Sequence, residues 1–127
     1  MTLPEWLHRP DNKSAFYTNE RCTITELVNS DASPHVSVAK ASVAPGQTTQ
    51  LHCLRDVTEH YILCKGEGVM HVNGRESAVV EGDRVTIPAG EAQQISNTGT
   101  TTLEFLCVCT PRFTPDCYID LEGSVIV

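Results

Sequence analysis

The sequence predicts an all-β domain, a sandwich or barrel of short antiparallel strands. Its apolar residues fall in short runs rich in Val, Ile, Leu, Thr and aromatic residues, and single Gly and Pro residues separate these runs. Such spacing is typical of all-β domains, and no segment shows a convincing helical pattern. With 127 residues, the chain is long enough for one domain around one hydrophobic core.

Nine strands are expected, most of them rich in residues that favour extended backbone. In chain order they cover residues 22–28, 35–43, 48–54, 59–65, 68–73, 77–80, 84–88, 93–96 and 103–109. No regular structure is expected in the first twenty residues, where Pro4 and Pro10 have turn chemistry. Beyond Cys109, Pro111 and Pro115 end the strand, because proline lacks the backbone donor that a ladder needs.

The turns between these strands are specified more sharply than the strands. Asn73-Gly74 lies between two apolar runs, a position where a type I′ hairpin turn favours Asn-Gly. Pro45-Gly46, residues 81–83 and residues 88–90 indicate three further turns. The segment 46–97 is therefore a succession of strands and tight reversals.

The chain is acidic, with a formal net charge of -7 and a pI near 5.1. An acidic surface repels phosphate groups, so we expect no nucleic-acid partner. No window approaches the ~20 apolar residues that a membrane helix needs. The beginning of the chain also lacks the basic and apolar regions of a secretion signal. We therefore expect a cytoplasmic protein with no membrane partner.

Six cysteines occur, at positions 22, 53, 64, 107, 109 and 117. The count is even, but without a secretion signal we expect reduced thiols rather than a disulfide framework. Cys107 and Cys109 would share one face of a strand, which disfavours a disulfide between them and suggests small packing residues. No C-x-x-C pair indicates a structural zinc site.

Two spaced motifs stand out in the central part of the chain. The first has the pattern G-x5-H-x6-E-x6-G and consists of Gly46, His52, Glu59 and Gly66. The second has the pattern G-x5-P-x-G-x6-N and consists of Gly82, Pro88, Gly90 and Asn97. Both resemble the two motifs of the cupin family, and the resemblance extends from Val36 to Cys109.

The resemblance implies a double-stranded antiparallel β-barrel of the cupin or jelly-roll type. It places the barrel at residues 36–109, an N-terminal extension with an outer strand at 1–35, and a C-terminal extension at 110–127. It also implies a small single-domain bacterial protein that forms a homodimer. The strand at 22–28 would lie on a neighbouring subunit, since an unpaired apolar strand invites aggregation.

Residues two apart on a strand share a face, so His52 and Leu54 should both point into the barrel. Glu59 would face them from the next strand. The residues of matching parity complete a mostly apolar pocket that suits a small organic ligand. The expected pocket consists of His52, Leu54, Glu59, Tyr61, Leu63, Gln93 and Ile95.

In metal-binding cupins the first motif supplies two histidines and a glutamate, and the second supplies a third histidine. By resemblance, His52 and Glu59 match this set, while Leu54 and Gln93 replace the other two histidines. One interpretation is a divalent ion (Zn, Ni, Fe or Mn) held by His52, Glu59 and Gln93. A second is a hydrogen-bonded polar pair. A third is metal-free catalysis with His52 or Glu59 as general acid or base.

Two functions follow from these interpretations. The first is a small-molecule-binding protein whose pocket surrounds His52, Glu59 and Gln93. The second is a metal-dependent enzyme, such as a dioxygenase, decarboxylase or isomerase of the kind found among cupins. Whether the protein is an enzyme stays open at this point, because one fold hosts many chemistries.

Several residues outside the pocket receive simpler interpretations. His60 and His71 alternate away from the barrel interior, so we expect them at the surface or at a subunit interface. Phe113 and Tyr118 are expected to fill a groove as part of a surface extension. The apolar residues 125–127 are expected either to fray or to add a strand to another subunit.

Overall fold

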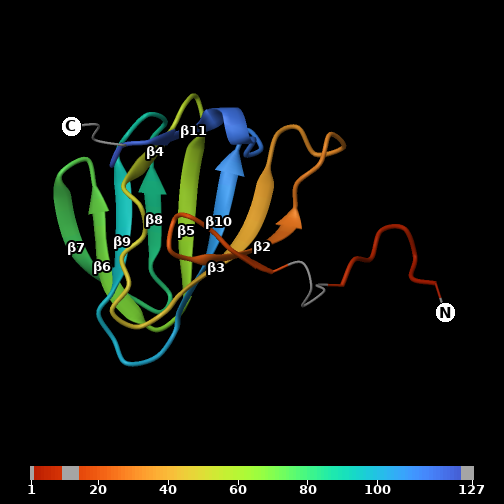
Figure 1. The fold of residues 1–127 in the computed structure, drawn as a ribbon. Coiled ribbons are helices and arrows are strands. Elements are labelled where there is room, and N and C mark those ends of the chain that lie inside the picture. Colours follow the sequence, from red (N-terminus) through yellow and green to blue (C-terminus); the bar gives the residue numbers. More distant parts are fainter. Residues whose placement is uncertain (1, 10–14, 124–127) are drawn as a thin grey trace.

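The computed structural model describes residues 2–9 and 15–123, and it consists of two antiparallel sheets (Figure 1). The six-stranded sheet has the order β1 (Phe16–Tyr17), β2 (Thr23–Val28), β3 (Ser37–Val43), β10 (Leu103–Thr110), β5 (Thr58–Lys65) and β8 (Arg84–Ile87). The five-stranded sheet has the order β11 (Tyr118–Asp120), β4 (His52–Leu54), β9 (Gln93–Asn97), β6 (Glu67–Val72) and β7 (Arg75–Val80).

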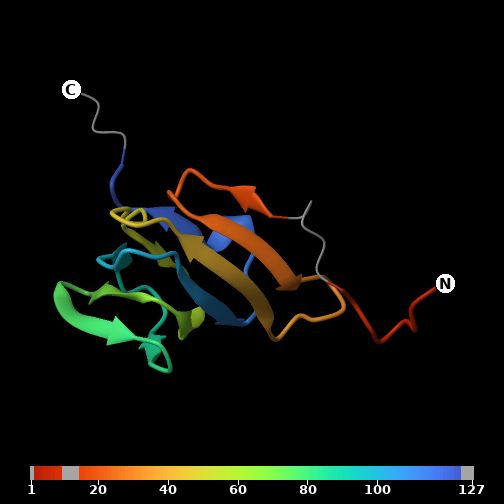
Figure 2. The same cartoon turned by 90° about the horizontal axis from the view of Figure 1, so that it is seen from below.

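The two sheets form separate layers, which can be followed in Figure 2. Each of the nine predicted strands has a counterpart in the structure, so the all-β prediction and the jelly-roll fold are confirmed. Within the described residues, hydrogen bonding between strands does not close the two sheets into a continuous barrel.

The predicted hairpin at Asn73-Gly74 is confirmed. It joins β6 to β7, with Val72 opposite Arg75 at the end of the ladder. Both turn residues have positive φ, 50° for Asn73 and 82° for Gly74, as a type I′ turn requires. This turn fixes the register that places Met70 and Val79 in the core.

Asn97, the last residue of the second motif, holds together the loop between β9 and β10. Its side-chain amide donates hydrogen bonds to the carbonyls of Val43 (2.9 Å) and Thr101 (2.8 Å). Its oxygen accepts a third hydrogen bond from the Gly99 amide at 2.9 Å. An asparagine here therefore satisfies three backbone groups at one junction of the two sheets.

The main core lies between the sheets and is formed by alternate residues of the central strands. Its fully buried side chains include Phe105, Leu63, Ile87, Ile95 and Leu103. Tyr61 stacks on Phe105 with ring centroids 4.5 Å apart. A second cluster, formed by Leu54, Val57, Cys109 and Cys117, lies against Phe113 and Tyr118.

The structure corrects the expectation for the first twenty residues. Phe16 and Tyr17 form a short strand, β1, because they pair with Ile24 and Thr23 of β2. The strand was not predictable from so short an apolar pair, since two residues show no periodicity. As a result, β2 is covered over part of its outer edge by the chain itself.

The C-terminal segment also contributes to a sheet. After the short 3-10 helix η2 (Pro115–Cys117), strand β11 pairs with β4, so that Tyr118 lies opposite Leu54 and Asp120 opposite His52. This pairing brings the C-terminal segment to the end of the molecule where His52 lies. The expectations for residues 125–127 fall outside the described residues.

Candidate functional site

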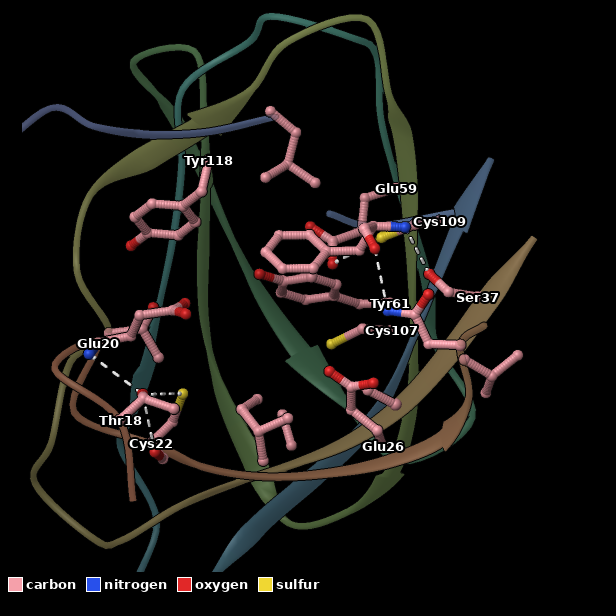
Figure 3. Close-up of a pocket in the computed structure, with 18 of the residues that line it drawn as sticks. Thr18, Glu20, Cys22, Glu26, Ser37, Glu59, Tyr61, Cys107, Cys109 and Tyr118 are labelled. Atoms are coloured by element: carbon pink, nitrogen blue, oxygen red, sulfur yellow. Dashed lines mark hydrogen bonds between the residues drawn. The ribbon is translucent and has the colours of Figure 1, made fainter. Parts of the chain in front are cut away.

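A cavity of about 150 Å³ opens at the face of the six-stranded sheet that is turned toward β4 and β11 (Figure 3). Strands β2, β3, β5 and β10 supply most of its wall, and β4 and β11 supply the opposite side. The walls are mostly apolar and carry a small set of polar groups. That combination is typical of small-molecule sites.

Glu59 is the buried acid of this cavity, with only 7% of its surface exposed. Its Oε2 accepts a hydrogen bond from the Cys109 thiol at 3.5 Å, whereas its Oε1 is buried without any hydrogen-bond partner. Burial raises the pKa of Glu59 to about 7, and the nearby polar groups of Gln93 and Cys109 act in the opposite direction. Glu59 can therefore gain or lose a proton near neutral pH.

His52 lies on the opposite wall and is also buried. Its Nδ1 is 2.7 Å from the carbonyl of Gln50, so this nitrogen carries the proton and donates. The ring stacks on Tyr118 with centroids 4.7 Å apart, and the Tyr118 hydroxyl donates to Gln50 Oε1 at 2.5 Å. Burial lowers the pKa of His52, so its ring is neutral at pH 7 with Nε2 as an acceptor.

Gln93 lies deeper than the cavity wall. It is buried, and its Oε1 accepts a hydrogen bond from the Tyr61 hydroxyl at 2.6 Å. Tyr61 lines the cavity in front of it. Gln93 therefore acts on the cavity through Tyr61 and through the pKa of Glu59.

The predicted pocket residues thus fall into two groups. His52, Leu54, Glu59 and Tyr61 come together around the cavity. Gln93, Leu63 and Ile95 share the inward parity of their strands but are buried below the cavity; Leu63 and Ile95 belong to the main core. The position of a residue along its strand predicts which face of the sheet its side chain lies on, but not how deeply the side chain is buried. Here the depth depends on the stacking of Tyr61 on Phe105.

The residues assigned to a metal by resemblance do not form a compact ligand set. Among the described residues, no three His, Cys, Asp or Glu side chains lie close enough to hold one ion. The oxygen of Gln93 is already engaged by Tyr61, and Leu54 packs against the C-terminal segment. One imidazole and one carboxylate are too few donors for a tight transition-metal site.

Several cavity residues were missed by the sequence analysis. Glu20, Cys22 and Glu26 reach the cavity from the segment before and within β2, and Phe113 and Tyr118 reach it from the C-terminal segment. Phe113 and Tyr118 were expected to fill a groove of a surface extension, whereas both contribute to the cavity wall. No local signal marks these residues, because only the pairing of β2 with β3 and of β11 with β4 brings them there.

Among the described residues, the cysteines and the two outer histidines belong to no cluster of three or more potential metal ligands. All six thiols are free, and Cys107 and Cys109 line the cavity beside Glu59 (Figure 3). His60 bonds Thr86 and His71 lies 3.3 Å from Glu76, both outside the cavity. Among the described residues, no helix is long and apolar enough to span a membrane.

The fold and the cavity define a class of protein. The family model described as a cupin domain matches residues 39–109, which is more than half of the chain, and the chain belongs to this family. The resemblance carried by the two motifs is thereby confirmed.

Individual relatives extend this assignment. An oxalate-binding protein of Thermotoga maritima is 40% identical over 70 residues, which span 55% of this chain and 58% of the length of that protein. An uncharacterized protein of Methanocaldococcus jannaschii is 30% identical over 105 residues, spanning 81% of this chain and 84% of that protein. A solved structure from T. maritima, described as a predicted oxalate decarboxylase, has 29% identity and a TM-score of 0.70, with 87% of this chain and 99% of that chain covered.

Proposed function

We propose that this cupin is a small-molecule-binding protein whose ligand occupies the cavity between His52 and Glu59. The observation that carries the proposal is Glu59, which lines the cavity and whose Oε1 is buried without a hydrogen-bond partner. Leaving a buried acceptor unpaired costs about 1–3 kcal/mol, so a donor on a ligand would recover that loss. Gln93 supports the site from behind Tyr61.

The relatives support a small ligand without fixing its identity. One is named for binding oxalate and another is described as a predicted oxalate decarboxylase. Cavity size gives the same indication, because a cavity of about 150 Å³ admits a molecule about as large as benzene. The polar atoms of His52 and Glu59 would orient such a molecule from opposite walls.

Chemical-shift mapping by NMR tests the proposal. A fragment collection that contains neutral, cationic and anionic molecules is added to ¹⁵N-labelled protein. The proposal expects shifts confined to amides around the cavity and expects them to vanish in Ala39→Phe, which fills the cavity from β3. Ala78→Phe on the exposed face of β7 is the matched control. Shifts that persist unchanged in Ala39→Phe would place binding elsewhere.

A second candidate function is a metal-dependent enzyme, such as a dioxygenase, decarboxylase or isomerase. The orientation of His52 favours it, because an Nδ1–H bonded to a carbonyl leaves Nε2 free, as in many metal-binding histidines. Glu59 and Gln93 would be the remaining ligands. Elemental analysis of untagged protein separates the candidates: the binding proposal expects metal well below one per chain. One metal per chain, lost in His52→Ala, would favour the enzyme.

We further propose that the protein is a bacterial, cytoplasmic homodimer. Support for pairing comes from exposed apolar side chains on β1 and β2, namely Phe16, Tyr17, Leu27 and Val28. Such residues on neighbouring strands near a sheet edge favour contact with a second copy. Light scattering coupled to size exclusion tests this: a mass of twice 13.9 kDa is expected, and a monomer at micromolar concentration would contradict it.

A further inference from the structure

We propose that the cavity selects a small organic cation, an amine whose apolar body is about as large as a benzene ring. This inference rests on the proposed function, because it assigns a chemical class to the ligand of the same cavity. It is carried by the charge of the cavity wall, by the unpaired oxygen of Glu59 and by the aromatic rings around both.

The charged groups of the wall all have one sign. Three carboxyl groups contribute to the lining, those of Glu20, Glu26 and Glu59, and the described lining residues include no Lys or Arg. Figure 3 shows these three acids among the lining side chains, with Glu59 beside Cys109. The remaining titratable ring, His52, is held neutral by burial. A wall of this kind attracts cations and repels anions.

Glu59 gives the site a specific anchor. An acidic wall alone would be compatible with a solvated surface. Glu59, however, is buried, with 7% of its surface exposed, and its Oε1 makes no hydrogen bond. An ammonium group offers three donors and a positive charge. An ammonium group would donate a hydrogen bond to Oε1. It would also offset the repulsion between the carboxylates of Glu20 and Glu59, which contributes to the raised pKa of Glu59.

The rest of the wall suits the apolar part of such a molecule. His52 stacks on Tyr118 on one side, and Tyr61 stacks on Phe105 on another. Phe113 also lines the cavity. Aromatic faces attract cations and pack against flat apolar groups, so they favour an amine attached to a ring or a short hydrocarbon.

The same arrangement disfavours oxalate, the ligand in the name of one relative. Oxalate carries two negative charges and would need a cation to hold it among three carboxyl groups. No lysine, arginine or compact metal-ligand cluster serves this purpose in the described part of the cavity. We therefore infer that this cavity differs from an oxalate site in the sign of the charge on the ligand that it binds.

Calorimetric titration with matched probes tests the inference. Benzylamine, benzyl alcohol and benzoate share one ring and differ in charge, and oxalate is added as a fourth probe. At pH 7.5 and low salt, the inference expects benzylamine to bind at least about tenfold more tightly than benzyl alcohol, because hydrogen bonds to charged groups are the strong ones. Benzoate and oxalate are expected to show no measurable binding.

Two variants locate the effect. Glu59→Gln keeps the shape of the side chain and removes its charge, and it should weaken benzylamine binding by about tenfold or more while leaving benzyl alcohol nearly unchanged. Glu76→Gln changes an exposed acid on β7, outside the cavity, and should leave both affinities unchanged. Circular dichroism confirms that each variant is folded.

The outcomes separate this inference from the proposed function. Equal binding of benzylamine and benzyl alcohol, or tighter binding of benzoate, overturns the selection of cations while the cavity remains a small-molecule site. Failure of all probes to bind also overturns the inference, and the fragment mapping then decides whether the cavity binds any molecule. A loss of benzylamine binding in Glu59→Gln, with none in Glu76→Gln, supports it.

Discussion

Replacing Glu59 by Gln should change how stability depends on pH, and the structure sets the size of the change. Burial raises the pKa of Glu59 from its ordinary value of 4.5 to about 7 in the folded protein. The folded state therefore binds more protons than the unfolded state between these values, so the free energy of unfolding falls as pH rises through them. At about 1.4 kcal/mol per pH unit, wild type should lose about 2–3 kcal/mol between pH 5 and pH 8 through this carboxyl group.

The other titratable groups of the cavity determine how the measurement is made. Burial lowers the pKa of His52, which makes stability rise with pH and so acts in the opposite sense. The neighbouring thiols and phenols have raised pKa values and stay protonated up to pH 8; they are those of Cys22, Tyr61, Cys107, Cys109 and Tyr118. Glu20, whose pKa burial also raises, and Glu26 complete the set.

Urea denaturation of wild type and Glu59→Gln at pH 5, 6, 7 and 8 isolates the Glu59 contribution as the difference between the two proteins. The variant should gain stability relative to wild type as pH rises, by about 2–3 kcal/mol in total. Glu81→Gln, at an exposed position in the turn between β7 and β8, should show the same difference from wild type at every pH. If the difference in the free energy of unfolding between Glu59→Gln and wild type were also independent of pH, the assignment of a raised pKa to the buried Glu59 carboxyl group would be refuted.

Three further variants test the fold and the metal assignment. Gly68→Ala would drive a Cβ into the carbonyl oxygen of Ser96, so a loss of about 3 kcal/mol or more is expected in urea denaturation, and an unchanged midpoint would contradict the β6–β9 contact. Asn97→Ala removes three hydrogen bonds and should cost about 3 kcal/mol by the same measurement; a loss below about 1 kcal/mol would argue against the loop geometry. Leu54→His combined with Gln93→His should raise the affinity for Ni²⁺ by orders of magnitude in calorimetry, because two imidazole donors are restored. No gain would show that these positions do not face the same point.

The strands and turns could be predicted from the sequence because their determinants are local. Asn73-Gly74 adopts positive φ in any chain that forms this hairpin, and the neighbouring residues alternate with a period of two. The spacing of His52 and Glu59 is likewise a property of two strands that follow each other in the chain, β4 and β5, one in each sheet. Their convergence on one cavity therefore followed from the motif.

The far walls of the cavity could not be predicted, because they depend on contacts between distant segments. Glu20 enters the site through the pairing of β2 with β3, and Tyr118 enters through the pairing of β11 with β4. Gln93 has the parity of an inward residue but is covered by Tyr61. Side-chain packing in the folded state, and not the local pattern, decides these three positions.

The most direct test of the account is a crystallographic fragment soak of untagged, chelator-treated protein. The account predicts electron density for a small molecule inside the cavity, with a donor atom within hydrogen-bonding distance of Glu59 Oε1 and an apolar part against the stacked rings of His52 and Tyr118. An empty cavity across the whole fragment set, with density only at other surfaces, would contradict it.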